Sequence, residues 1–542
     1  MKVYQCVAQA VAKEGTEVIF GLMADDNLDI LVELDDRWGV KFISARHEQG
    51  AVAMADGWSR STGKVVVCTV GRGPAIAQTG TALVTARKRN TPMVLLLTTQ
   101  PWSDRATTKW FEQEGFLKYT IGAVEALRSP ETVAEDVRRV FRHARSGRGP
   151  VVLHMPKDIL EADLPDSWQY EPVDVQPQRT APDPERVEEA AVLLETTERP
   201  PVILAGRGAV ESGAKQEIEA LAERLGAFLG TTLLAKGYFE GHPYNLGVVG
   251  TYSTDKALEF LSTADCLLAL GCSLNERTTH HGHTFPRARI IQVDHQPAVI
   301  GDRTEIDLGI AGDIKATVTA LNRQLAADGV DRKARFWTPE IAEYLAGAGV
   351  IEGDYTYLEG RMDPREFVDT INNKLPDKRT VVVDSAHFVR FVIDGITIRS
   401  PDELIWTTDF SAIGLGLVMA IGNAVARPER RCVLFSGDSG FMMHAQELDT
   451  AVRFGLPMTM FIMNDNALGS EVRQMEKKGK PTHLAHSKNP QFAELARGFG
   501  AKGFTVRSVA DIERHADEFF NADGPVVVDV KINRNVAHRL SL

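Results

Sequence analysis

The chain has 542 residues, of which 44% are hydrophobic and 25% are charged, and its formal net charge at pH 7 is −12. A usual domain has roughly 100–200 residues, so this length favours three domains, and the composition is that of an ordinary globular protein. The negative net charge argues against nucleic acid as a partner, because phosphate binding needs clustered Lys and Arg side chains.

The first twenty residues have an amphipathic helical pattern that includes Glu14 and Glu17, and no small-residue cleavage site follows, so we expect no signal peptide. No apolar stretch approaches the roughly 20 residues that cross a bilayer. The five cysteines are far apart and form no Cys-x-x-Cys pair, which is typical of reduced, buried thiols. Together these features predict a soluble cytoplasmic protein without a membrane partner.

Short apolar runs, separated by segments of helical periodicity, predict parallel strands joined by crossover helices in the first block. The runs lie at residues 17–20, 41–44, 65–70, 93–98 and 151–155. They predict a doubly wound α/β domain over residues 1–165. Ligands of such folds bind beyond the carboxyl ends of the strands, so chemistry is expected in the loops that follow these runs.

A polar segment with five prolines, residues 164–185, has no helical or strand period and predicts an extended linker. A second α/β domain is then predicted over residues 184–330, from apolar runs at 200–206, 266–271 and 288–294. Gly206-Arg207-Gly208 follows the first of these runs and looks like a nucleotide loop. A Gly-x-Gly pair alone is a weak signal.

Strands reappear after a weaker joint at residues 347–363, with runs at 380–384, 404–407, 432–436, 458–464 and 526–530. They predict a third doubly wound domain over residues 355–542. His387 follows the first of these strands and therefore stands at a ligand-binding edge. With an unperturbed imidazole pKa of about 6.5 it could relay protons, and a structural role is the alternative.

The run 432–436 leads into a tight turn made of Gly437, Asp438, Ser439 and Gly440, and then into a helical pattern over 441–454. A glycine turn before a helix offers backbone N–H groups to an anion, so phosphate is the expected ligand. The alternative is a plain turn, because short Gly-rich matches are common.

The next strand ends at Asn464 and Asp465, and the turn continues through Ala467, Leu468 and Gly469. Two oxygen ligands at adjacent strand ends, with diphosphate oxygens and water, make the octahedral site that Mg²⁺ requires. We therefore predict Asp438 and Asp465 as metal ligands, together with a backbone carbonyl near Ala467. A helix cap is the alternative for Asn464 and its neighbours, but the pairing of both motifs after buried strands favours the metal site.

This pair of motifs resembles the signature of the thiamine diphosphate enzymes, in the group of acetolactate synthase, pyruvate decarboxylase and benzaldehyde lyase. That signature is Gly-Asp-Gly followed by a double Asn, and here Ser439 and Asp465 depart from it. The resemblance covers nearly the full length. It implies pyrimidine-binding, central Rossmann-like and diphosphate-binding domains, thiamine diphosphate and Mg²⁺ as cofactors, and a site shared between two chains of a homodimer or homotetramer.

The resemblance also implies roles for residues outside the metal motif. Glu48 matches the Glu that hydrogen-bonds the aminopyrimidine ring and activates the cofactor, and a helix cap is its alternative. Ile413 matches an apolar residue that props the cofactor into its bent shape, with a core role as the alternative. Asp25 matches an acidic group of the decarboxylases, and Gln113 a Gln that orients the bound carbonyl. A helix cap and a surface side chain are their respective alternatives.

The substrate stays open at this level. The Gln-Trp-Gln segment of acetolactate synthases becomes Val472-Arg473-Gln474, their Pro-Arg pair becomes Pro101-Trp102, and their FAD loops match only in part. FAD or another adenine nucleotide is therefore not favoured. We predict a decarboxylase or carboligase acting on a 2-oxo acid. The alternatives are a lyase that cleaves a 2-hydroxy ketone or 2-hydroxyacyl-CoA, and a cofactor-binding subunit with little turnover.

Overall fold

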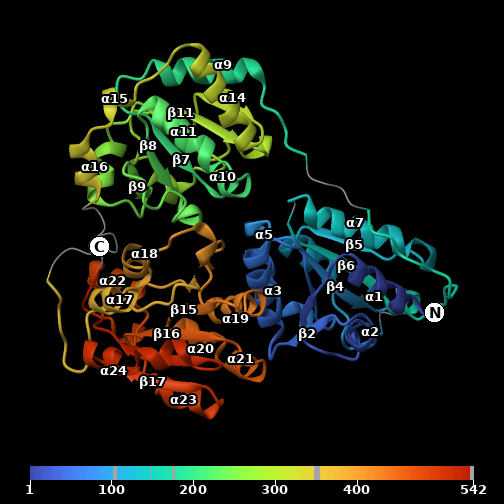
Figure 1. Cartoon of the computed structure of the whole chain (residues 1–542). Coiled ribbons are helices and arrows are strands. Elements are labelled where there is room, and N and C mark those ends of the chain that lie inside the picture. The colour runs from blue at the N-terminus through green and yellow to red at the C-terminus, as the bar shows by residue number, and fades with distance from the viewer. Residues whose placement is uncertain (102–105, 148, 174–177, 347–353, 538–542) are drawn as a thin grey trace. The chain divides into compact units, whose positions relative to one another are not determined.

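The computed structural model describes residues 1–101, 106–147, 149–173, 178–346 and 354–537. It contains three parallel sheets of six strands each, with helices around them (Figure 1). This confirms the predicted fold of three doubly wound α/β sheets. The chain forms two compact units: one comprises Met1–Gln176, Tyr355–Val389 and Ile405–Leu542, and the other comprises Pro177–Asp354 and Arg390–Leu404.

The first sheet has the strand order β2-β1-β3-β4-β6-β5. Its strands are β1 (Val18–Gly21), β2 (Lys41–Ser44), β3 (Val66–Thr69), β4 (Met93–Thr99), β5 (Ala123–Ala126) and β6 (Val151–Pro156). Its helices are α1 (Val3–Lys13), α2 (Leu28–Trp38), α3 (Glu48–Thr62), α4 (Pro74–Ala77), α5 (Gly80–Arg89), α6 (Gln113–Thr120), α7 (Val133–Arg145) and α8 (Lys157–Leu160). All predicted strands are present, and β5 is an unpredicted edge strand.

The second sheet has the order β12-β11-β10-β7-β8-β9, which is the Rossmann order 3-2-1-4-5-6 read from the other side. Its strands are β7 (Val202–Ala205), β8 (Phe228–Thr231), β9 (Asn245–Val248), β10 (Cys266–Leu270), β11 (Arg289–Asp294) and β12 (Leu308–Ala311). Its helices are α9 (Pro184–Glu195), α10 (Arg207–Glu211), α11 (Lys215–Leu225), α12 (Asp255–Leu261), α13 (Glu276–Thr279), α14 (Ile314–Ala327), α15 (Lys333–Phe336) and α16 (Pro339–Ala346). Parts of the predicted linker and of the joint at 347–363 lie outside the described residues.

The third sheet, β14-β13-β15-β16-β18-β17, repeats the order of the first. Its strands are β13 (Arg379–Val383), β14 (Leu404–Trp406), β15 (Arg431–Gly437), β16 (Met458–Asn464), β17 (Lys502–Val506) and β18 (Val526–Lys531). Its helices are α17 (Pro364–Asn372), α18 (Val389–Gly395), α19 (Gly416–Ala426), α20 (Asp438–Met443), α21 (Leu448–Arg453), α22 (Gly469–Lys477), α23 (Phe492–Gly498) and α24 (Val509–Asn521). No helix in the described ranges is long and apolar enough to cross a membrane. The cysteines are free and buried, as predicted.

Helices α3 and α19 cross closely inside the first compact unit, and small residues make the crossing possible. A Cβ atom on Gly57 would lie 2.3 Å from the carbonyl oxygen of Met419, and one on Gly422 would lie 1.9 Å from that of Met54. The surrounding apolar side chains of both helices belong to one hydrophobic cluster. The run of small residues after Glu48 therefore fits this close helix contact.

A buried ion-pair network adjoins the same crossing. The guanidinium of Arg60 donates to both carboxylate oxygens of Asp56, at 2.8 and 2.7 Å, and to Asp409 at 2.5 Å. Its side chain is only 4% exposed. Thr91 adds a hydrogen bond to Asp56 at 2.6 Å.

Removal of this cation leaves the buried carboxylate of Asp56 without its ion-pair partner, so Arg60→Ala is expected to destabilise the chain by about 3–5 kcal/mol. The midpoint of thermal unfolding measures the effect. Arg37→Ala, which removes an exposed partner of Glu33, is the matched control and should change stability by less than about 1 kcal/mol. Equal midpoints for the two variants would contradict a stabilising role of the network.

Candidate functional site

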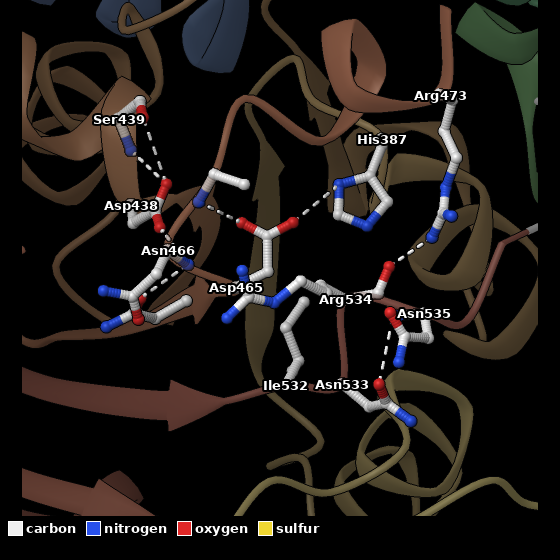
Figure 2. A network of polar contacts seen from close by, with 12 residues as sticks. His387, Asp438, Ser439, Asp465, Asn466, Arg473, Ile532, Asn533, Arg534 and Asn535 are labelled. Atoms are coloured by element: carbon white, nitrogen blue, oxygen red, sulfur yellow. Dashed lines mark hydrogen bonds and ion pairs between the residues drawn. The ribbon is translucent and has the colours of Figure 1, made fainter. Parts of the chain in front are cut away.

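Three neighbouring strands of the third sheet deliver acidic side chains to one edge. Strands β13, β15 and β16 are adjacent, and β15 and β16 pair in register up to Gly437 and Met463. Asp384, Asp438 and Asp465 follow these three strands directly. Because the carboxyl ends of parallel strands share an edge, the predicted motifs lie side by side, and Figure 2 shows Asp438 and Asp465 in one polar network.

Backbone and amide donors fix the carboxylate of Asp438. Its Oδ1 accepts from the backbone of Ser439 at 2.6 Å, and its Oδ2 accepts from the backbone of Asn466 at 2.9 Å. The amide of Asn489 also donates to Oδ2, at 2.7 Å. The bond to Asn466 ties the diphosphate turn directly to the loop after β16.

The carboxylate of Asp465 has one oxygen without a hydrogen bond. Its Oδ1 accepts from the backbone of Ala467 at 3.0 Å, whereas Oδ2 is buried and has no hydrogen-bond partner in the described part of the chain. The Nδ1 atom of His387 lies 3.5 Å from Oδ2. Burial lowers the pKa of His387 to about 4, so this imidazole is neutral and does not offset the charge of Asp465.

Electrostatics at this edge favour a cation. Burial raises the pKa of Asp465 to about 6. Burial, followed by the charge of Asp465, raises that of Asp438 to about 6. Two buried carboxylates that repel each other, one with an orphaned oxygen, fit a hard divalent cation such as Mg²⁺. Protein groups supply only part of an octahedral shell, which leaves room for diphosphate oxygens.

This arrangement predicts a pH dependence. The folded-state pKa of each carboxyl group lies above the unfolded value of about 3.9, so each contributes stability to the apoprotein at low pH that is lost as the pH rises through 6. Metal binding needs the ionised forms. The rise in unfolding midpoint caused by Mg²⁺ and thiamine diphosphate should therefore be large at pH 7.5 and shrink below pH 6. A rise that is independent of pH between 5 and 8 would contradict this.

The other predicted residues of the second loop take different positions. The fully buried side chain of Asn464 donates to Asp529 of β18 at 2.9 Å. Leu468 is exposed, and Gly469 begins α22, where a Cβ atom would lie 2.2 Å from Nδ1 of His387. Asn464 thus ties two strands together, and Gly469 lets α22 approach His387. Their proposed cofactor contacts stay predictions.

The diphosphate turn differs in one respect from the expected one. The helix predicted over 441–454 is wrong as a single element, since α20 ends at Met443 and α21 begins at Leu448. His444 interrupts it, because its Nδ1 atom lies 2.7 Å from the carbonyl oxygen of Gly414 instead of facing solvent. Gly437 is extended and Ser439 lies within α20. The replacement of the family's Gly by Ser439 therefore requires no left-handed backbone.

Asp384 connects this turn with the segment that carries Ile413. Its buried carboxylate accepts from the backbone of Gly414 at 3.1 Å and from the hydroxyl of Ser436 at 3.0 Å. A Cβ atom on Gly440 would lie 2.8 Å from the same carboxylate. Ile413 itself is 38% exposed, so it is not a core residue and is open to a ligand.

Glu48 is the first residue of α3. The helix cap is His47, whose ring accepts from the backbone of Gln49 at 3.1 Å. The carboxylate of Glu48 is half-buried and has no hydrogen bond or ion pair to the described residues. The structure thus does not use Glu48 as the capping residue and leaves its carboxylate available.

Comparisons with known proteins agree with this geometry. Three family models match the chain: the N-terminal TPP binding domain of thiamine pyrophosphate enzymes at residues 1–119, the central domain at 187–321 and the C-terminal TPP binding domain at 387–530. The chain belongs to the thiamine pyrophosphate enzyme family. The predicted family and its cofactor, thiamine diphosphate, which is the same compound as thiamine pyrophosphate, are confirmed.

The relatives of this thiamine pyrophosphate enzyme match it over nearly their whole length. A probable acetolactate synthase large subunit of Methanocaldococcus jannaschii is 30% identical over 98% of this chain and 92% of the relative. An acetolactate synthase of Arthrospira platensis is 29% identical over 97% and 93% of the two chains. The acetolactate synthase large subunit of Haemophilus influenzae is 26% identical over 98% and 94%.

Asp25 and Gln113 of this thiamine pyrophosphate enzyme lie at the corresponding edge of the first sheet. The exposed Asp25 pairs with Lys109 at 2.7 Å, and this hydrogen bond lowers its pKa. It does not cap α2, whose cap position is Asn27. Gln113 begins α6, and its Oε1 lies 3.5 Å from the backbone nitrogen of Gly73. Asp25 is therefore an ionised partner of Lys109, which disfavours it as a proton donor near neutral pH.

Two cations at this edge were not predicted. Arg72 follows β3 and pairs with the buried Asp26 at 3.1 Å, and Lys109 lies 3.7 Å from the same residue. The Nη1 atom of Arg72 makes this ion pair, and its Nε atom is buried without a hydrogen-bond partner in the described ranges. No spacing in the sequence joins these residues, because they come from three separate loops. The predicted Pro101-Trp102 difference falls partly on residues 102–105, outside the described residues.

The glycines of the suspected nucleotide loop have a packing role in the central domain of this thiamine pyrophosphate enzyme. A Cβ atom on Gly206 would lie 2.3 Å from the carbonyl oxygen of Gly271, and one on Gly208 would lie 2.8 Å from its Cα atom. Strands β7 and β10 are neighbours, so their following loops meet here. Close approach of two backbones explains both glycines without a nucleotide.

Proposed function

We propose that this thiamine pyrophosphate enzyme is an acetolactate synthase-like carboligase and decarboxylase that acts on a 2-oxo acid. The observation that carries the proposal is the pair of buried carboxylates, Asp438 in a glycine turn and Asp465, at adjacent strand ends, with an oxygen of Asp465 that has no hydrogen bond to the described residues. Relatives named probable acetolactate synthase large subunit and acetolactate synthase, matched over 92% and 93% of their own length, support the reaction class.

Asp438, Asp465 and the backbone carbonyl of Ala467 would hold Mg²⁺ against the diphosphate. Thiamine diphosphate, when bound, supplies the carbon that adds to the substrate carbonyl. The carboxylate of Glu48 would hold and move the proton that activates it. Ile413 would orient the cofactor, and the apolar surroundings of α3 would exclude water.

Arg72 and Lys109 support an acidic substrate. The Nε–H group of Arg72, which has no hydrogen-bond partner among the described residues, suits a carboxylate, and Gln113, on the neighbouring loop, would orient the carbonyl. Asp25 and Asp26 balance these two cations, so a bound acid competes with the exposed carboxylate of Asp25 for Lys109. An exposed pair of this kind contributes only about 0–1 kcal/mol, which makes the exchange feasible.

We further propose a homodimer or homotetramer in the cytoplasm, with domains at residues 1–165, 184–330 and 355–542. The family resemblance, which divides the site between two chains, supports the oligomer, and the free, buried cysteines support the compartment. An adenine nucleotide is not part of the proposal.

Incubation of the purified protein with thiamine diphosphate, Mg²⁺ and a panel of 2-oxo acids tests the function. We expect release of carbon dioxide together with a carboligation product, and a KM for the acid about tenfold higher in Arg72→Ala than in wild type, the loss expected for one charge-assisted hydrogen bond. An aldehyde released from a 2-hydroxy ketone or 2-hydroxyacyl-CoA, without carbon dioxide, would replace this proposal by a lyase. Cofactor binding without any turnover would indicate a low-activity subunit.

A further inference from the structure

We propose that Glu447 is a positioning residue that fixes the backbone from which Glu48 reaches the cofactor. Glu447 lies in the third domain, between the diphosphate turn and α21, and is completely buried. The inference rests on the proposed role of Glu48 and adds a residue that never touches the cofactor itself.

The carboxylate of Glu447 accepts a hydrogen bond from the backbone just before Glu48. Both of its oxygens lie 3.0 Å from the backbone nitrogen of Arg46. The hydroxyl of Thr450 holds the carboxylate from the other side, at 2.7 Å. A carboxylate at the first turn of α3 is also favoured by the helix dipole.

Gly50, two residues after Glu48, shows how closely α3 approaches the carboxylate of Glu447. A Cβ atom on Gly50 would lie 2.5 Å from Oε1 of Glu447. Helix α3 therefore starts directly against the carboxylate, and no larger residue fits at this position without displacing it. The glycine and the buried acid form one contact, although they are 397 residues apart in the sequence.

Neighbouring contacts hold the same segment. Arg453 donates to the hydroxyl and the carbonyl oxygen of Ser44, at 2.8 and 2.7 Å. Gln49 lies 3.3 Å from the ring of His444. The segment 444–453 thus holds the backbone before Glu48 and the side chain of Gln49 after it, while the Glu48 carboxylate has no partner among the described residues. A fixed backbone beside a carboxylate without a protein partner is expected of a group that binds a ligand.

The test is the rate at which the hydrogen on the thiazolium carbon of protein-bound thiamine diphosphate exchanges with deuterium in the presence of Mg²⁺. We expect Glu447→Gln to slow this exchange by about 10²-fold, as for a displacement of roughly 1 Å at a reacting group. The carboxylate accepts from the backbone N–H of Arg46 with both oxygens, and the amide replaces one of these acceptors by an NH₂ donor. The cofactor Kd should stay within about threefold of wild type, less than the tenfold change that 1.4 kcal/mol gives. Gly50→Ala disturbs the same contact from the other side and should act in the same direction if Glu447→Gln does not fold.

Glu513→Gln is the control. Glu513 lies on α24 of the same domain and pairs with Lys374 at 2.9 Å, away from the segment 444–453, so exchange should match wild type. Wild-type exchange in Glu447→Gln, alongside slow exchange in Glu48→Gln, would overturn the positioning role. Loss of cofactor binding in a folded Glu447→Gln would also overturn it. Slow exchange in the wild type itself would overturn the proposed function. That outcome differs from failure of the positioning role, in which wild type and Glu447→Gln both exchange fast.

Discussion

Replacement of Glu48 by Gln should lower the rate of carbon dioxide release from a 2-oxo acid by about 10²- to 10⁴-fold, the usual contribution of a positioned acid–base group. The amide keeps the size of the side chain but cannot take up a proton. The carboxylate has no structural partner in the described ranges, and the helix cap is His47. Thermal stability should therefore stay close to that of wild type.

Glu17→Gln is the control for this variant. Glu17 lies in the same domain and forms an exposed pair with Lys64 at 2.6 Å, so its loss should leave turnover unchanged. Retention of more than a tenth of the wild-type rate in Glu48→Gln, with the same substrate and cofactor concentrations, would remove Glu48 from the catalytic machinery.

The second large effect is expected at the metal site. Asp438→Ala should raise the Kd of thiamine diphosphate in the presence of Mg²⁺ by more than about 10²-fold, since even groups that only support a metal ligand cost about 10- to 100-fold in affinity. The variant also removes one of the two acceptors for the backbone of Asn466, the one that joins the two cofactor loops. Isothermal titration of the apoprotein measures the affinity.

Asp465→Asn keeps an oxygen ligand for the metal and removes the negative charge. This variant restores the amide that the family signature has at this position, so it should bind the cofactor within about tenfold of wild type. Its apoprotein should unfold at a higher temperature at pH 7.5, because a buried charge that repels Asp438 is gone. Cofactor binding by Asp438→Ala as tight as that of Asp465→Asn would contradict the metal assignment.

Most strands that are buried on both faces were predicted, although the internal strand β8 was not, and most edge strands were missed. Strand β16 is apolar along its length and buried at all seven positions, so a short apolar run marked it clearly. Strand β5, with the sequence AVEA, is half-buried throughout, and β9 contains Gly247 in a left-handed conformation. Edge strands pair on one side only and need fewer apolar side chains, so their pattern is weak.

In the candidate site too, residues marked by a local sequence pattern were predicted, and residues defined by contacts distant in the sequence were not. Asp438 and Asp465 were predictable because each directly follows a buried strand, and parallel strands end at one edge. Asn489, Asp384 and Glu447 were not, because their partners are 51, 30 and 401 residues away. No periodicity or short motif encodes contacts of that range. The interruption of the helix predicted over 441–454 belongs here too, since the contact of His444 with Gly414 spans 30 residues.

The central claim is that this chain binds thiamine diphosphate with Mg²⁺ and activates it through Glu48. Hydrogen–deuterium exchange at the thiazolium carbon of the bound cofactor, in wild type and Glu48→Gln, tests it most directly. The account predicts exchange at least about 10²-fold faster in wild type than in Glu48→Gln or in free cofactor, in line with acid–base activation. Exchange at the rate of the free cofactor in the wild type, with the cofactor fully bound, would contradict it.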